Sequence, residues 1–427
     1  MTTEFAVQGL GVRALAEEFG TPLYLYDGAA LRRRAGALRE LLHPRLEVFF
    51  SLKANPNISL CALLRSQGAR AEVSSMTELH TAVRAGVEPR DIVFLGPGKS
   101  RAEITACLEL GVYAVICESF GELDLIDEVA AHLGTTAPVA LRVNPAFAVK
   151  GSGLTMGGKP RQFGIDEAQL MEHAPLAGRH RHLRLMGVQV YLGTRILNEE
   201  TIVRNTERIL ELAPRVAGHH GFELEMVDIG GGLGVAYFDG ERDLDLPVLA
   251  KGLNPVLDAF GERHPGTRLI MELGRYLVAE SGTYVVRVRY AKTSLGENFA
   301  VTDGGTNHHM AAVGIGSFVK RNYPIRLLSR AGEPAGESWN VTGPLCTPND
   351  TLCKRAALPD LREGDLLGVE RSGAYGPSAS PVLFLGHGHP AEVLVDEGRA
   401  HLIREPDTAD DLLRKQRLYH PSGSVSG

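Results

Sequence analysis

The segment LEVFFSLKANPN, residues 46–57, places a lysine where the residues before it predict a buried strand. Its first seven residues form a short apolar run rich in residues that favour β-strands, and the run breaks at Asn55-Pro56-Asn57. Lys53 therefore stands at the point where a buried strand becomes a loop. Taken alone, a lysine at such a place is most simply a surface residue that happens to follow a strand.

Similar apolar segments recur along the next part of the chain, and helical patterns separate them. Several of the amphipathic segments end at a glycine, as SLCALLRSQG and TELHTAVRAG do. Strand and helix alternating over roughly 230 residues predict a (β/α)8 barrel, whose usual size is about 250 residues, with a doubly wound open sheet as the competing arrangement. The eight expected strands are LEVFFSLK, RAEVSS, DIVFLGPGK, YAVICES, VALRVNP, LMGVQVYLG, LEMVDIGGGLG and RLIMELGR.

The pattern changes after Arg275. Strand-like segments such as GTYVVRVRYAKT, ENFAVTDGG and PAEVLVDEG follow one another with turns and little helix between them, which predicts an antiparallel β-domain. GTPLYLYDG, near the N-terminus, also reads as a strand and is a candidate member of the same sheet. We therefore expect a barrel over residues 28–278 and a β-domain made of residues 1–27 and 279–427.

Composition limits the function classes. The chain has 427 residues, 44% of them hydrophobic and 22% charged, which is typical of soluble globular proteins. Its net charge of −6 gives no basic surface for nucleic acid, and no apolar run is long enough to span a membrane. Five scattered cysteines without a CxxC pair fit a reducing compartment and argue against a structural zinc site. We expect a cytoplasmic protein without a signal peptide, a metal or a nucleic-acid partner.

Barrel geometry gives Lys53 a chemical context. Residues that end different strands of a barrel meet in one pocket, although they are distant in sequence. The glycines of GGGLG, at the end of the seventh strand, are suited to let the backbone approach a phosphate. The residues expected at this mouth are Lys53, Arg142, Tyr191, Thr194, Gly230 to Gly234, Glu272 and Arg275.

A lysine beside a phosphate site points to pyridoxal 5'-phosphate, whose aldehyde condenses with an amine and whose phosphate needs an anion cradle. Glu272 fits the same cofactor, because a carboxylate against the pyridine nitrogen keeps that nitrogen protonated. A salt bridge from Glu272 to Arg275 is the simpler alternative.

At these residues the chain resembles the fold type III pyridoxal-phosphate decarboxylases, the group of diaminopimelate, ornithine and arginine decarboxylases. SLKAN, VDIGGGLG, ELGR, GPLC and SGAYG fall in the family's order over nearly the whole length. The resemblance implies an alanine racemase-like barrel and a homodimer that shares its active sites. It implies that Lys53 holds the cofactor, that Glu272 faces the pyridine nitrogen, and that Cys346 comes from the second subunit as a catalytic residue. The remaining cofactor contacts expected are Glu72, Arg142, Tyr191, Thr194, Gly231, Gly232, Arg275 and Tyr375.

Two departures from the family bear on the substrate. Tyr191 stands where the family usually stacks a histidine on the cofactor ring, so stacking is retained without a positive charge. In diaminopimelate decarboxylases Glu and Ser follow the cysteine, and that glutamate reads the distal amino group. Here Thr347 and Pro348 follow Cys346, and an unpaired buried ammonium costs several kcal/mol. Asp303 or Asp350 could compensate, and Thr347 and Asp350 are our candidate substrate contacts.

The segments DGGTNHHMAA, GPLCTPND and SGAYGPSASPVLFLGH more closely resemble a branch that contains the butirosin-pathway decarboxylase, which acts on glutamate held on an acyl carrier protein. We therefore expect an α-decarboxylase of a carrier-bound acidic amino acid in antibiotic biosynthesis. Decarboxylation of free diaminopimelate, lysine or ornithine is the alternative. A racemase and a non-catalytic binding protein are further alternatives, and the intact Lys53, Glu272, Cys346 and Tyr375 argue against the second of these.

Overall fold

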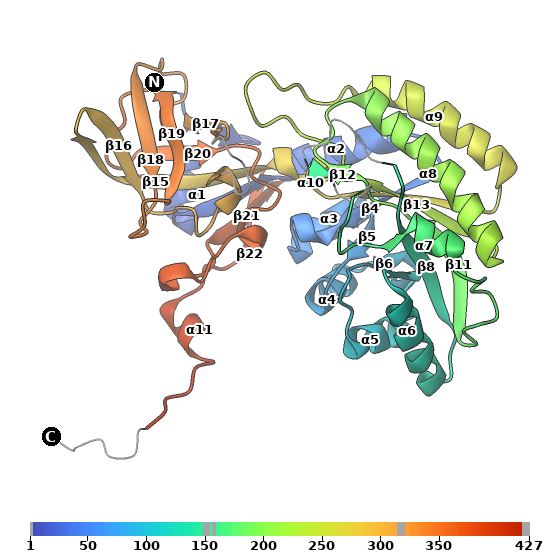
Figure 1. The fold of residues 1–427 in the computed structure, drawn as a ribbon. Helices are drawn as coiled ribbons and strands as arrows, with labels where there is room; N and C mark the ends of the chain where they lie inside the picture. Colours follow the sequence, from blue (N-terminus) through green and yellow to red (C-terminus); the bar gives the residue numbers. More distant parts are fainter. Residues whose placement is uncertain (1–2, 148–153, 156–158, 314–320, 421–427) are drawn as a thin grey trace. The chain divides into compact units, whose positions relative to one another are not determined.

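The computed structural model describes residues 3–147, 154–155, 159–313 and 321–420. The chain divides into two compact units (Figure 1). Unit 1 comprises Met1–Tyr26, Thr283–Glu370 and Ala379–Gly427, and unit 2 comprises Asp27–Gly282 together with the short segment Arg371–Ser378. Each unit is described by itself below.

Unit 2 is a closed barrel of eight parallel strands, which confirms the predicted fold class. Neighbouring strands are paired in parallel all the way round, and pairing of the fourth strand with the fifth completes the ring. All eight segments expected from the sequence are present. In chain order the strands are β4 (Leu46–Ser51), β5 (Arg70–Val73), β6 (Ile92–Phe94), β7 (Ala114–Cys117), β8 (Ala137–Asn144), β11 (Leu183–Gln189), β13 (Met226–Gly231) and β14 (Arg268–Leu273).

Helices surround this barrel, and their ends carry the expected signals. Ser75, Ser100 and Ser119 cap helix N-termini by accepting backbone N–H bonds, whereas Gly111 and Gly221 close C-termini in the left-handed conformation. Helices α8 and α9 lie side by side along one flank (Figure 1). The helices are α2 (Gly28–Leu41), α3 (Ile58–Ser66), α4 (Met76–Arg84), α5 (Arg101–Leu110), α6 (Phe120–Leu133), α7 (Glu167–Glu172), α8 (Glu199–His220), α9 (Leu246–Arg263) and α10 (Arg275–Val278).

Side chains fill the inside of the barrel, so it is a core and not a channel. Phe49, Ile116, Met186, Met226 and Ile270 come from five different strands, and each is at most 1% exposed. Because the strands are covered on both faces, they read in the sequence as continuous apolar runs. Short pairings flank the barrel: β10 (Ile165–Asp166) extends β8, and β9 (Leu154–Thr155) pairs with β12 (Gly193–Thr194).

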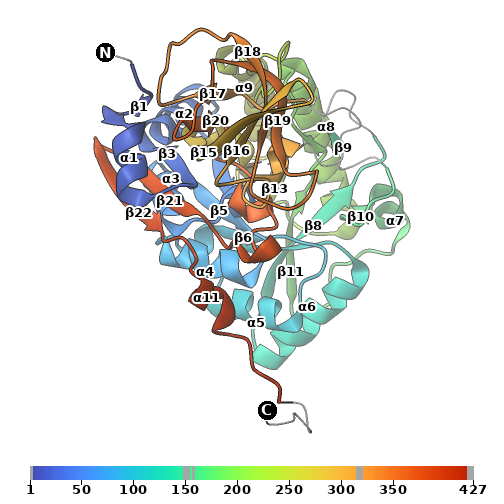
Figure 2. The ribbon, with the colours of Figure 1, turned by 90° about the vertical axis from the view of Figure 1, so that its left-hand side faces the viewer.

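Unit 1 is built on a nine-stranded sheet, parts of which are visible in Figures 1 and 2. The N-terminal strand β3 joins this sheet between β15 and β21, as the sequence indicated. β15 pairs antiparallel with β16 and β20, as do β17 with β20, β18 with β19 and β21 with β22, whereas β16 and β18 pair in parallel. The strands are β3 (Leu23–Asp27), β15 (Gly282–Ser294), β16 (Glu297–Thr302), β17 (Ile325–Leu327), β18 (Glu337–Thr342), β19 (Thr351–Leu358), β20 (Leu366–Val369), β21 (Ala391–Asp396) and β22 (Arg399–Arg404).

Smaller elements complete unit 1. A two-stranded hairpin of β1 (Ala6–Val7) and β2 (Leu10–Gly11) leads into α1 (Val12–Phe19), whose Val12 and Leu15 pack against the buried Leu23 and Val393 of the sheet. Helix α11 (Ala409–Leu413) lies near the C-terminus. Within the described ranges no helix is both long and apolar enough to cross a bilayer.

Candidate active site

Lys53 lies in a single helical turn, Leu52–Ala54, directly after β4. Its Nζ is 3.2 Å from Oε2 of Glu72, which lies on the neighbouring strand β5 and is fully buried. Burial would raise the pKa of Glu72, but the Lys53 ammonium and the hydrogen bonds from Ser51 and Ser74 together lower it below its usual value. Desolvation would lower the pKa of Lys53, but the carboxylates of Glu72 and then Glu272 raise it. The strand-end lysine is therefore a charged residue held by a buried acid.

Glu272, near the end of β14, is also buried, and Gln189 Nε2 donates to its Oε1 at 3.3 Å. Burial first, and the neighbouring Glu72 second, raise the pKa of Glu272. Asp228 of β13 faces the Glu272 carboxyl, and its own pKa is raised well above the usual range by burial and by Glu272. Glu72 and Glu272 thus share the single Lys53 ammonium, and Asp228 adds a third buried acid beside Glu272, so a further cation would be stabilised there.

Among the residues that the structure describes, those that line the pocket at Lys53 all belong to unit 2. Tyr375 reaches it because the Tyr375 N–H donates to the carbonyl of Ala54 at 2.7 Å, which fixes the 371–378 segment to the turn that carries Lys53. The Arg275 guanidinium lies 4.6 Å from the centre of the Tyr375 ring. The pocket is lined by Ser51, Lys53, Tyr191, Thr194, Gly232, Leu233, Glu272, Leu273, Gly274, Arg275 and Tyr375.

The glycine loop after β13 lies against this pocket in a conformation that only glycine adopts easily. Gly232 has φ +96°, and a Cβ at this position would come within 2.2 Å of the Gly193 carbonyl oxygen. A Cβ on Gly231 would come within 1.6 Å of the Glu272 carbonyl oxygen. The wall of the pocket at these two glycines is therefore backbone, because neither position has room for a side chain.

Tyr191 and Arg142 have different surroundings. The Tyr191 ring centre lies 5.9 Å from Lys53 Nζ, and burial raises the pKa of its phenol. Arg142, by contrast, is not among the pocket-lining residues: its Nη1 donates to Glu118 at 2.9 Å, and its guanidinium covers the Phe163 ring. A contact of Arg142 with the cofactor stays a prediction.

Cys346, Thr347 and Asp350 belong to unit 1, where they form one tight turn. Cys346 is a free, exposed thiol. Asp350 is buried, and it accepts hydrogen bonds from the N–H groups of Thr306 and Leu345 at 2.8 and 2.7 Å. Asp350 Oδ2 therefore holds this turn, and its Oδ1 ties the turn to the segment at Thr306. A contact of Asp350 with the substrate stays a prediction.

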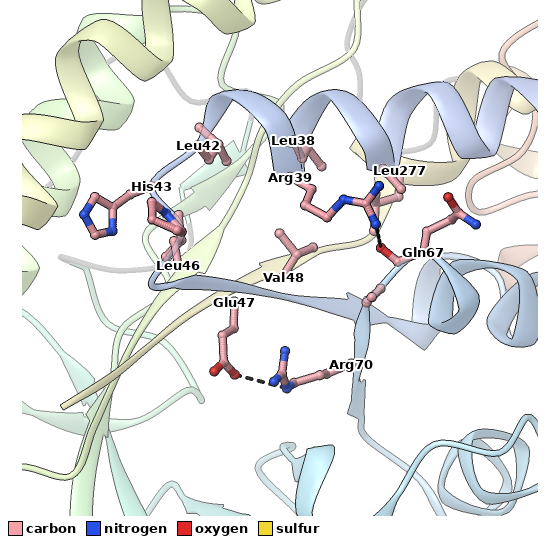
Figure 3. Close-up of a pocket in the computed structure, with 14 residues that line it drawn as sticks. Leu38, Arg39, Leu42, His43, Leu46, Glu47, Val48, Gln67, Arg70 and Leu277 are labelled. Atoms are coloured by element: carbon pink, nitrogen blue, oxygen red, sulfur yellow. Dashed lines mark hydrogen bonds and ion pairs between the residues drawn. The ribbon is translucent and has the colours of Figure 1, made fainter. Parts of the chain in front are cut away.

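Figure 3 shows another cavity of unit 2, of about 260 Å³, beside the first residues of β4 and β5. Its apolar wall includes Leu38 of α2 and Val48 of β4. Arg70, on its edge, pairs with Glu47 and Asp91. Because barrel enzymes place their chemistry at the C-terminal ends of the strands, this cavity has no part in the site we describe.

Comparison with known proteins identifies the family. Residues 29–279 match the family described as "Pyridoxal-dependent decarboxylase, pyridoxal binding domain". The chain belongs to this family. It is 40% identical over 409 residues to an L-glutamyl-[BtrI acyl-carrier protein] decarboxylase of Niallia circulans, covering 95% of this chain and 96% of that protein. It is 31% identical over 402 residues to a diaminopimelate decarboxylase of Helicobacter pylori, covering 94% and 96% of the two chains.

Solved structures agree with this assignment. The structure of a diaminopimelate decarboxylase from Helicobacter pylori in complex with L-lysine aligns with a TM-score of 0.84 and 30% identity, covering 94% of this chain and 98% of that one. The expected family, barrel fold, decarboxylase class and pyridoxal-phosphate cofactor are thereby confirmed.

The pocket of this pyridoxal-dependent decarboxylase fits its cofactor. The pocket offers a lysine amine for the aldehyde and a buried carboxyl for the ring nitrogen. An arginine beside a glycine backbone is suited to the phosphate. Among the described residues, no group of three or more His, Cys, Asp and Glu side chains is arranged to hold a metal ion.

Sequence reasoning overlooked several residues around this pocket. Asp228 and Gln189 carried a signal, because each is a polar residue within an apolar strand segment, VDI and GVQV. Tyr237, which contacts Arg275, carried none, since its importance depends on the loop that lies beside it.

Proposed function

We propose that this decarboxylase removes the α-carboxyl group of an L-glutamyl unit held as a thioester on an acyl carrier protein, in secondary metabolism. The observation that carries the proposal is the 40% identity over 95% of the chain to a decarboxylase of that substrate. We place the enzyme in the cytoplasm, since its five cysteines are all free thiols.

The turn at Cys346 supports this choice. Thr347 and Pro348 leave no acid directly after the cysteine, and the two acids that could replace it are already engaged. Asp350 holds its own turn, and Asp303 accepts hydrogen bonds from Thr21 Oγ1 and the Arg287 N–H at 2.5 and 2.8 Å. A neutral thioester needs no such partner, whereas a second ammonium would be buried without one.

The residues of the pocket have different proposed roles. Lys53 would hold the cofactor through its amine, and Glu272 would keep the ring nitrogen protonated. The groups proposed to bind the phosphate are Thr194, Gly231, Gly232, Arg275 and Tyr375. When bound, pyridoxal phosphate supplies an electron sink for the pair left on Cα as CO2 departs. Tyr191 would pack on the cofactor ring, and Glu72 would keep the Lys53 amine in place.

Substrate preference tests the proposal. With purified enzyme, kcat/KM for CO2 release from glutamyl carrier protein should exceed that for free glutamate, and both should exceed those for meso-diaminopimelate, lysine and ornithine. We expect kcat/KM for the carrier-bound substrate to be at least about a hundredfold higher than for the diamino acids, because an unpaired buried ammonium costs several kcal/mol. A preference for any free diamino acid would contradict the proposal and favour the family's basic-amino-acid branch.

We further propose a homodimer in which Cys346 of one copy donates a proton to Cα in the site built on Lys53 of the other. Each of the variants Lys53→Ala and Cys346→Ala should be inactive alone. Mixed and allowed to exchange subunits, they should recover up to about a quarter of wild-type activity, because half of the dimers are mixed and each has one intact site. No recovery after exchange verified by mass spectrometry would contradict the shared site.

A further inference from the structure

The loop between β13 and α9 holds a buried tyrosine against the arginine of the pocket. Tyr237 is 3% exposed, and its phenol oxygen accepts a hydrogen bond from Arg275 Nη1 at 3.1 Å. The Arg275 guanidinium also lies 5.5 Å from the centre of the Tyr237 ring and 4.6 Å from that of Tyr375. Two aromatic rings and one hydrogen bond therefore set the orientation of this guanidinium.

Two acids fix the loop that carries Tyr237. Glu241 accepts the N–H groups of Tyr237 and Phe238 at 3.0 and 3.3 Å, and it pairs with Arg195, whose guanidinium lies over the Tyr237 ring.

Asp243 accepts a hydrogen bond from the Ala236 N–H at 2.8 Å and two more from the Arg371 guanidinium, both at 2.8 Å. Burial would raise the pKa of Asp243, but Arg371 and the Ala236 N–H lower it below its usual value, so the Asp243 carboxyl is ionised. The loop is thus built to hold one side chain rigidly.

We infer that Tyr237 is a positioning residue that holds the Arg275 guanidinium in place for the phosphate group of the cofactor. A neutral phenol orients the guanidinium without cancelling its charge, so Arg275 keeps its attraction for an anion. The inference rests on the proposed role of Arg275 as a phosphate ligand. Pre-organisation of this kind lowers the cost of ordering the arginine when the phosphate binds.

The test is cofactor binding to the apo-protein. Tyr237→Phe should weaken binding of pyridoxal 5'-phosphate about tenfold, the usual effect of losing a hydrogen bond to a charged group, and leave binding of pyridoxal, which lacks the phosphate, unchanged. Tyr276→Phe is the matched control. Tyr276 is as buried as Tyr237, its phenol oxygen accepts a hydrogen bond from Arg34 at 3.3 Å, and its ring contacts the Arg34 guanidinium. Tyr276 does not line the pocket. It should change neither affinity.

A double mutant separates this inference from the proposed function. In an Arg275→Gln background, Tyr237→Phe should have no further effect on pyridoxal-phosphate affinity. An equal loss for both ligands, no loss, or the same loss in that background would overturn the positioning role. If Arg275→Gln itself leaves the affinity unchanged, the phosphate assignment of Arg275 is wrong and the role of Tyr237 falls with it. Thermal midpoints of the apo-proteins report any general loss of stability.

Discussion

Replacing Lys53 with alanine should abolish decarboxylation and leave no cofactor that borohydride can fix to the protein. Lys53 Nζ is the amine in the pocket, between the buried Glu72 and the Tyr191 ring. Without it, the cofactor would have no amine in the pocket to attach to, so kcat should fall on the order of a thousandfold or more. Activity and the mass of the reduced protein measure the two effects.

An exposed lysine of the same unit provides the control. Lys251 lies on the outer surface of α9, and Lys251→Ala should leave both activity and reductive labelling at wild-type levels. Labelling of Lys53→Ala to the wild-type extent would show that another amine carries the cofactor.

The barrel was predictable from sequence because its strands are covered on both sides. Segments such as LEVFFS and AVIC are continuous apolar runs, and capping serines and terminal glycines mark the helices between them. Knowing the barrel, one can place Lys53, Glu272 and the glycine loop at a single mouth, since all follow or end neighbouring strands.

Side-chain pairing was less predictable, because it depends on register and on loop paths that the sequence pattern does not encode. Arg142 ends a strand as expected, yet it pairs with Glu118, 24 positions earlier on the neighbouring strand's loop. Tyr375 joins the pocket through a backbone bond to Ala54, more than 300 residues away in sequence. Tyr237 gives no signal at all, because its partner is fixed only once the loop is folded.

A second strand-end lysine shows how burial changes a lysine's role. Lys99 follows β6 as Lys53 follows β4, but its side chain is only 1% exposed. Its Nζ donates to Glu122 Oε1 at 2.7 Å and to the carbonyls of Gly96 and Ile116 at 2.7 and 2.5 Å. An ammonium has three N–H donors, and all three are used. Lys99 therefore stabilises the barrel and has no donor left for a ligand.

Lys99→Met should consequently cost about 3–5 kcal/mol of unfolding free energy, because Glu122 would be left as a buried charge without its cation. The thermal midpoint should fall on the order of 10 °C, measured by scanning fluorimetry of the holoenzyme. Adding Glu122→Gln removes the uncompensated charge and keeps an acceptor for the Glu118 N–H, so the double variant should be more stable than Lys99→Met alone.

Arg204→Met, which breaks the exposed pair of Arg204 with Glu200 on α8, should shift the midpoint by no more than about 2 °C. Equal destabilisation by the buried and exposed changes would show that the buried pair does not stabilise the barrel.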